Sequence, residues 1–63
     1  MSTFKERLEI EKEELDTKIK ALSGFIQSEN FSKIDSVQQI LLKAQLLIMT
    51  TYSVILNERL NLL

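Results

Sequence analysis

The chain has 63 residues, neither cysteine nor histidine, and a formal net charge of −1. This length allows one domain, whose core alone seldom supplies more than roughly 3–5 kcal/mol of stability. The composition excludes disulfides, thiolate or histidine metal sites and Ser–His or Cys–His catalysis, and the small net charge gives no general attraction to DNA, RNA or lipid. We therefore expect no catalytic residues, no metal and no cofactor, and we expect self-association to stabilise the fold.

An all-α fold is predicted, because the chain has no proline, one glycine and many strong helix formers. Thr3 and Glu6 have the spacing of a capping box, so a first helix is expected over residues 4–28. Its apolar residues share one face and its charged residues cover the rest, which is typical of a helix with one packed and one solvated side. Phe4 and Phe25 are expected in the core.

The segment 29–35 is expected to be a turn, with Phe31 closing the end of the hairpin. Asp35 and Gln38 repeat the capping-box spacing and predict a second helix over residues 36–62. At about 1.5 Å per residue this helix would be close to 40 Å long and would lie antiparallel to the first. All 63 residues are thus predicted to form a single helical hairpin.

The second helix is far less charged than the first. Three residues from Ser36 onward are charged, against fourteen among the first 35. One apolar sector of its helical wheel contains Val37, Ile40, Leu41, Ala44, Leu47, Ile48, Val54 and Ile55. A second apolar sector, which we assign to an oligomer interface, contains Leu42, Leu46, Met49, Leu56, Leu60 and Leu63. Because the first helix can cover only one sector, the hairpin is predicted to assemble into a homo-oligomeric helical bundle.

The apolar stretch of the second helix is not expected to span a membrane. Lys43, Gln45 and Thr50 interrupt it, and it is shorter than the roughly 20 residues that a spanning helix needs. The charged N-terminal segment lacks the apolar region of a signal peptide. We therefore expect a cytoplasmic protein without a membrane partner.

Gln38, Gln45, Tyr52 and Arg59 recur every seven residues and form a polar line between the two apolar sectors. Such a line can simply fix register and oligomeric state, as one buried polar residue does in coiled coils. It can also form a ligand site, because guanidinium binds phosphate, a phenol ring stacks on a base and glutamine hydrogen-bonds to base edges. The sequence leaves both interpretations open.

The chain resembles a family of short bacteriophage helical-hairpin proteins over nearly its whole length. The resemblance rests on two segments, FKERLEIEKEELDTKIKALSGFIQSENF and QQILLKAQLLIMTTYSVILNERL. Its characteristic features are Arg7, Glu11, Phe25, Ile26, Leu42, Gln45, Met49, Tyr52 and Arg59. Part of that family is similar to the hairpin of phage anti-CBASS and anti-Thoeris sponges, which sequester cyclic oligonucleotide or ADP-ribose-derived immune signals in hexamers with pockets between chains.

The resemblance implies a phage anti-defence protein in the cytoplasm of the infected host, which would bind a cyclic nucleotide without turnover. The nucleotide-binding residues would be Lys43, Gln45, Met49, Tyr52 and Arg59. In this hypothesis Arg59 and Lys43 bind phosphates, while Tyr52 stacks on a base. The alternative is a homo-oligomeric interaction module that binds a host or phage protein by helix-in-groove contacts.

Overall fold

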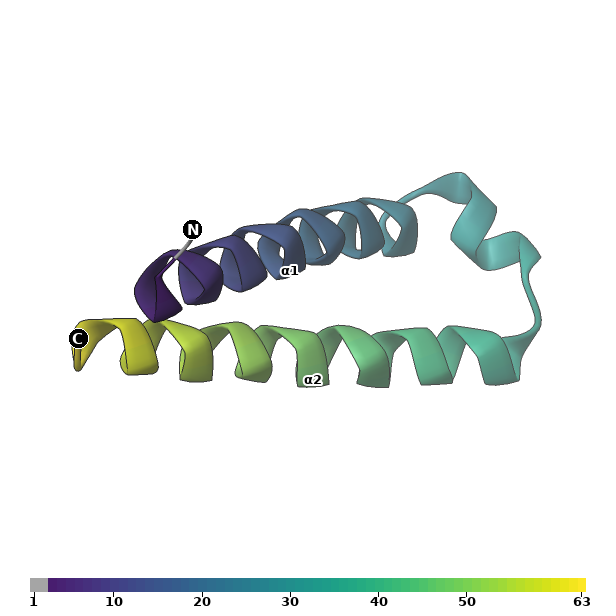
Figure 1. Cartoon of the computed structure of the whole chain (residues 1–63). Helices are drawn as coiled ribbons and strands as arrows, with labels where there is room; N and C mark the ends of the chain where they lie inside the picture. Colours follow the sequence, from purple (N-terminus) through teal and green to yellow (C-terminus); the bar gives the residue numbers. More distant parts are fainter. Residues whose placement is uncertain (1–2) are drawn as a thin grey trace.

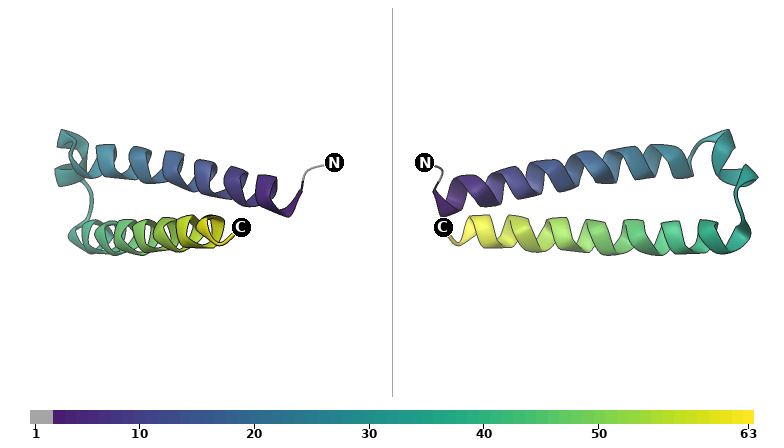
Figure 2. Two further views of the ribbon diagram at one scale, coloured as in Figure 1. Left: turned by 90° about the vertical axis from the view of Figure 1, so that its left-hand side faces the viewer. Right: turned by 45° about the vertical axis from the view of Figure 1, so that its right-hand side comes forward.

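The computed structural model describes residues 3–63 and consists of two antiparallel helices joined by a short 3₁₀ helix (Figure 1). Helix α1 spans Phe4–Ile26, the 3₁₀ helix η1 spans Glu29–Lys33, and helix α2 spans Ser36–Asn61. The predicted all-α hairpin is confirmed, and the expected helix ends differ from these by one or two residues. The N- and C-termini lie at the same end of the molecule (Figure 2).

Helix α1 begins with the predicted cap, since the Thr3 hydroxyl accepts a hydrogen bond of 3.1 Å from the backbone N–H of Glu6. The residues that it turns towards α2 are buried or half-buried: Leu8, Leu15, Ile19, Leu22 and Ile26. The expectation that Phe4 and Phe25 are core residues is wrong. Phe4 is 56% exposed and Phe25 is 36% exposed, because both lie at the margin of the packed face.

The turn is held by different contacts from those expected. Asp35 caps α2 without a side-chain hydrogen bond, so the predicted second capping box does not form. Instead, the Gln39 amide donates hydrogen bonds of 3.0 and 3.1 Å to the carbonyls of Phe31 and Ile34. Phe31 is buried and meets the Phe25 ring edge-on at 6.1 Å between centroids. This contact confirms that Phe31 closes the hairpin end.

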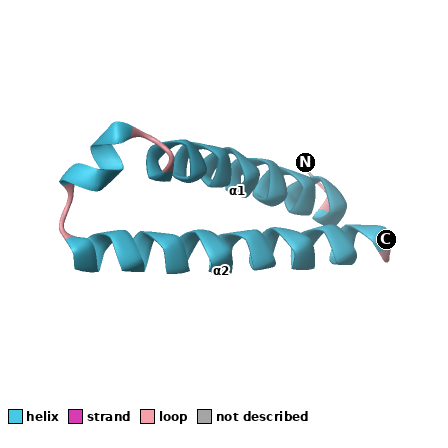
Figure 3. Ribbon diagram, turned by 180° about the vertical axis from the view of Figure 1, so that it is seen from behind, coloured by secondary structure: helices cyan, strands magenta, loops and turns pink. Residues whose placement is uncertain are grey.

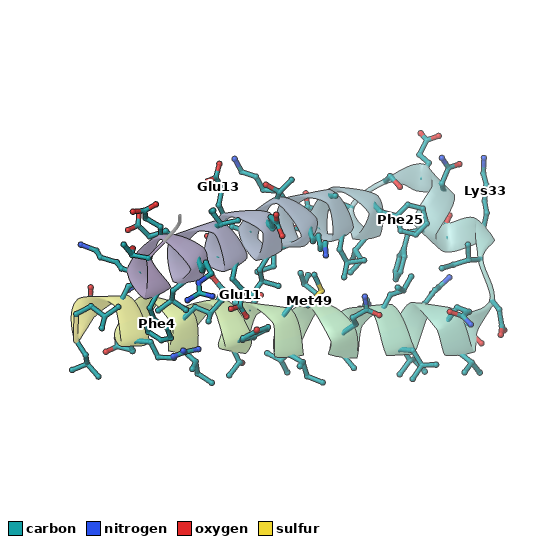
Figure 4. All side chains as sticks on the ribbon, in the orientation of Figure 1. Phe4, Glu11, Glu13, Phe25, Lys33 and Met49 are labelled. Atoms are coloured by element: carbon teal, nitrogen blue, oxygen red, sulfur yellow. The ribbon has the colours of Figure 1, made fainter. Side chains whose placement is uncertain are left out.

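The core lies nearer the end that carries the termini, where the two helices converge (Figures 1 and 3). Leu56 is completely buried and Leu8 is only 3% exposed, whereas the helices diverge towards η1. The inner face of α2, which contacts α1, is formed by Leu42, Leu46, Met49, Ser53, Leu56 and Leu60. Figure 4 shows Met49 pointing from this face towards α1.

The two apolar sectors of α2 therefore have the opposite roles from those we expected. The sector assigned to the oligomer interface packs against α1, and the other sector is exposed. Five of the six leucine and methionine residues assigned to the oligomer interface lie on the inner face, and Leu63 is exposed at the C-terminus. The other sector is open to solvent, with Leu47, Ile48 and Ile40 each more than two-thirds exposed. Both sectors are similarly apolar, so periodicity alone does not indicate which one α1 covers. Homo-oligomeric assembly stays a prediction.

Within residues 3–63, α2 is long and apolar enough to cross a membrane, by length and composition alone. Only 6% of its apolar window is buried in the hairpin. The core helix of a soluble assembly meets the same criteria, so this is weak support for a membrane span. The expectation that the chain does not enter a membrane stays a prediction.

Candidate functional site

A closed hydrogen-bond network occupies one edge of the groove between the helices, which we call the Ser53 edge (Lys12, Asp16 and Ser53). The Lys12 ammonium donates to Asp16 at 2.7 Å and to the Ser53 hydroxyl at 3.3 Å. The Ser53 hydroxyl in turn donates to Asp16. The hydrogen bonds from Lys12 and from Ser53 hold the pKa of the Asp16 carboxyl below its ordinary value. These three groups satisfy one another and fix the register of α2 against α1.

The opposite edge, which we call the Arg59 edge, brings together residues from both helices. These residues are Phe4, Arg7, Glu11, Tyr52 and Arg59. The Tyr52 hydroxyl donates a hydrogen bond to the Glu11 carboxylate. The Arg59 guanidinium lies 5.9 Å from the centre of the Phe4 ring, within cation–π range. Figure 4 shows Glu11 and Phe4 on the side of α1 that meets α2.

The guanidinium groups and aromatic rings of the Arg59 edge are available to bind a ligand. Its hollow of about 270 Å³ is open to solvent and is lined by Phe4, Arg7, Leu8, Glu11 and Arg59. Within the described residues, the single ion pair joins Lys12 to Asp16, so neither guanidinium of this edge is neutralised by a carboxylate. Two guanidinium groups, one carboxylate and two exposed aromatic rings can bind a phosphate, a base face and a base amino or ribose hydroxyl group.

A larger hollow of about 620 Å³ lies beside the Ser53 edge, but its chemistry is less suited to an anionic ligand. Its charged lining residues are Glu9, Lys12, Glu13, Asp16 and Lys20. Carboxylates outnumber ammonium groups there, and Lys12 is already paired with Asp16. The smaller hollow, whose lining includes two arginines and one glutamate, is therefore the better candidate despite its size.

The structure divides the predicted nucleotide-binding residues into separate groups. Tyr52 and Arg59 meet at the Arg59 edge, through Glu11 and Phe4. Gln45 and Met49 lie one turn apart further along α2, where the Gln45 amide is 3.9 Å from the Met49 sulfur. Lys43 lies towards the turn, 5.6 Å from the centre of the Phe31 ring.

Lys43 and Arg59 are too far apart to act on one small phosphate group within a single hairpin. They are sixteen residues apart in α2, which corresponds to roughly 24 Å along the helix axis. A joint role for these two cations therefore requires more than one chain.

Sequence reasoning missed Phe4, Arg7 and Glu11 as site residues. Arg7 and Glu11 were recognised as features of the family resemblance, but neither was given a role in binding. The spacing of these three residues, i, i+3 and i+7, could have predicted that they share one side of the first helix. Whether that side faces α2 depends on how α1 packs against α2, and the spacing does not predict this packing.

The described residues contain no cluster of three or more His, Cys, Asp or Glu side chains able to hold a metal ion. The chemical groups of the Arg59 edge suit the recognition of a ligand.

The all-α hairpin and its open edge of cationic and aromatic side chains assign the chain to the class of small helical-hairpin binding proteins. The chain matches the Sequestin family over residues 2–62 and belongs to that family. This assignment confirms the sequence resemblance to sponge-like hairpins, and the family name indicates the sequestering of a small molecule or partner rather than catalysis. Comparison with the curated proteins and with the solved structures gave no significant match.

Proposed function

We propose that this chain is a cytoplasmic phage anti-defence protein that sequesters a cyclic nucleotide immune signal without converting it. The observation that carries the proposal is the convergence of Arg7 and Arg59 with two exposed aromatic rings at one edge of the hairpin. Membership of the Sequestin family supports binding as the activity. The phage source, the cytoplasmic location and the nucleotide specificity belong to the proposal.

In the proposed complex, the guanidinium groups of Arg7 and Arg59 donate charge-assisted hydrogen bonds to the ligand phosphates. Tyr52 and Phe4, which are 42% and 56% exposed, offer ring faces on which a base can stack. Glu11 accepts a hydrogen bond from a base amino group or a ribose hydroxyl once Tyr52 turns away from it. Gln45 and Met49 contact a more distant part of the ligand.

A single hairpin offers little depth to such a ligand, because the hollow at the Arg59 edge is shallow and largely open. Ligand sites usually bury most of the ligand surface. High affinity in this proposal therefore depends on a homo-oligomer in which a second chain covers the ligand. Lys43 can join this site only from another chain, because it lies too far from Arg59 within its own hairpin.

The test compares Arg59→Ala with Lys33→Ala by isothermal titration calorimetry. The probes are cyclic di-AMP, cyclic di-GMP, a cyclic triadenylate and cyclic ADP-ribose, and native mass spectrometry reports the oligomer. Arg59→Ala should weaken binding by roughly 10- to 100-fold, because it removes a charged hydrogen-bond donor, and should leave the oligomer unchanged. Lys33 lies on η1 and points away from the groove (Figure 4), so its removal should have no effect.

The alternative function is binding of a host or phage protein, and the exposed apolar sector of α2 favours it. If none of the nucleotides binds the unmodified chain, the nucleotide proposal is overturned and this alternative gains. If a nucleotide binds equally well after Arg59→Ala, the Arg59 edge is not the site.

A further inference from the structure

The outer side of α2 carries a second heptad pattern, which the intramolecular packing does not use. We call it the outer seam: Val37, Leu41, Ala44, Ile48, Thr51 and Ile55. These residues alternate at spacings of four and three, and every one of them is exposed. Such a spacing keeps one stripe of a helix facing a neighbouring helix over several turns. The inner face that contacts α1 lies on roughly the opposite side of α2.

The exposed surface of the chain has the size that a second copy would cover. A compact monomer of 7.3 kDa exposes about 4,200 Å² by the usual scaling of area with mass. This chain exposes 4993 Å² and measures 44 × 18 × 14 Å. The excess of roughly 800 Å² matches what one partner buries in an interface of standard size. An apolar helix face of this extent is unusual for a stable monomer.

We infer that the outer seams of two copies pack against each other in antiparallel orientation, and that this pairing adds Gln38 of the second copy to the ligand site at Tyr52. The polarity of the two flanks of the seam selects the orientation. Gln38, Gln45, Tyr52 and Arg59 lie on one flank, one position after Val37, Ala44, Thr51 and Glu58 respectively. Ile40, Leu47 and Val54 lie on the other flank, each one position before a seam residue. All seven flanking residues are exposed.

Antiparallel helices related by a twofold axis place equivalent flanks together, whereas parallel helices place opposite flanks together. In the antiparallel pair, the Ile40, Leu47 and Val54 flank of one copy meets the same apolar flank of the other. The polar flanks meet on the opposite side. A parallel pair would bury polar side chains against apolar ones at every turn, which costs free energy unless each finds a hydrogen bond.

The register follows from the charge of Glu58, which continues the heptad spacing beyond Ile55. Pairing Val37 with Ile55 and Ala44 with Ile48 of the second copy also sets Leu41 against Thr51, whose hydroxyl already donates a hydrogen bond to the Leu47 carbonyl. This register leaves Glu58 beyond the start of the partner's α2. A shift by one heptad would place Glu58 against Leu41, and an unpaired carboxylate there is unfavourable. The opposite shift would leave Thr51 and Ile55 beyond the start of the partner's α2, so the stated register gives the longest contact that keeps Glu58 outside the pair.

In this register the two polar flanks form one continuous strip. Gln45 of one copy lies beside Gln45 of the other, and Gln38 lies beside Tyr52 of the second copy. This part of the inference rests on the proposed function, because it adds residues of a second chain to the nucleotide site. The second copy thereby brings its Gln38 to Tyr52, a residue of the Arg59 edge, whereas Gln45 stays on the polar strip at a distance from Arg59.

A lipid surface is a poorer occupant of the outer seam than a second copy. Helix α1, with its many charged residues, packs along α2, so insertion of α2 would carry those charges into the hydrocarbon region. The flanks of the seam are also not basic, unlike those of helices that lie on anionic membranes.

Disulfide trapping of the full chain without ligand tests the pairing, since the native chain has no cysteine. Ala44→Cys and Ile48→Cys are made separately, one with a mass tag, and oxidised alone and as a mixture. The antiparallel register predicts that the mixture gives the mixed disulfide in at least tenfold excess over either homodisulfide. A Thr17→Cys variant, at an exposed position of α1 that is not part of the outer seam, should give no disulfide with either.

Homodisulfides of Ala44→Cys would overturn the antiparallel orientation. The absence of any disulfide, together with a monomeric mass by light scattering, would overturn the pairing, as would recovery of the protein with phosphatidylcholine–phosphatidylglycerol vesicles. A second variant, Ile48→Lys, should convert the dimer to a folded monomer, while Ile10→Lys at an exposed isoleucine of α1 should not. Because these measurements need no ligand, they can succeed even if no nucleotide binds.

Discussion

The two edges of the groove use the same kinds of residue in opposite ways. At the Ser53 edge, an ammonium, a carboxylate and a hydroxyl group hydrogen-bond to one another. At the Arg59 edge, the carboxylate and the phenol pair, but two guanidinium groups form no ion pair within the described residues. Tyr52 and Ser53 are neighbours in sequence, so one step along α2 separates the two edges. Polar groups that satisfy one another stabilise the hairpin, whereas unsatisfied and exposed ones are free to bind.

The largest expected effect is that of Leu56→Ala, which would disrupt both edges because Leu56 lies between them. This side chain is completely buried, and truncating a buried leucine to alanine typically costs about 2–5 kcal/mol. That is a large share of the stability of so small a chain. Urea denaturation followed by circular dichroism, at one protein concentration, measures it. Leu62→Ala, at a residue 86% exposed, is the control and should change the stability by less than about 0.5 kcal/mol.

An intermediate effect is expected when the hydroxyl groups of the two edges are removed separately. Ser53→Ala should lower the free energy of unfolding by about 0.5–1.5 kcal/mol, because Ser53 is buried and bonded to both Lys12 and Asp16. Tyr52→Phe should lower it by less than about 0.5 kcal/mol, because its hydrogen bond to Glu11 is exposed. The same denaturation experiment compares them. A larger loss for Tyr52→Phe would show that the Arg59 edge is structural and would remove the distinction between the edges.

The smallest expected effect is a dependence of stability on pH that belongs to the Ser53 edge. The pKa of Asp16 is lowered in the folded chain, first by the hydrogen bond from Lys12 and then by that from Ser53. Its contribution to stability is therefore fully present above the ordinary pKa of 3.8 and is lost as the pH falls through the folded value. Thermal melts between pH 2 and pH 7 measure this loss.

The comparison of variants isolates Asp16 from the other carboxylates of α1. Asp16→Asn should melt at a lower temperature than the unmodified chain at pH 7, and the two melting temperatures should converge in acid. Glu13→Gln is the control, since Glu13 points away from α2 (Figure 4), and it should leave the melting temperature unchanged at pH 7. A constant difference between Asp16→Asn and the unmodified chain at every pH would contradict a role for the Asp16 charge.

Local signals in the sequence predicted much of the fold. Thr3 begins α1 because its side chain satisfies a free backbone N–H, and Phe31 closes the turn because an aromatic ring between two amphipathic helices is drawn into their contact. The failures arose where a polar partner was assigned from spacing alone. Asp35 makes no capping bond, and Gln39, which was given no role, ties the turn to α2 instead.

The sequence predicted only part of the candidate site. Tyr52 and Arg59 were found because their heptad spacing places them between two apolar sectors of one helix. Their partners Phe4, Arg7 and Glu11 come from the other helix, so their relation to Tyr52 and Arg59 depends on how the two helices dock. Lys43 was grouped with Arg59 by family resemblance, and the length of α2 separates them.

The sequence by itself determined two helices, their approximate ends, the segregation of charge into α1 and the presence of two apolar sectors and a polar line on α2. These features follow from helical periodicity and capping chemistry, which act within a few residues. Only the tertiary structure decided which sector α1 covers, because both are similarly apolar and Ser53 must lie where Lys12 and Asp16 can reach it. Because α1 covers the inner face of α2, the outer seam is left exposed, and Tyr52 and Arg59 lie beside Glu11 and Phe4. This packing of the two helices forms the candidate site.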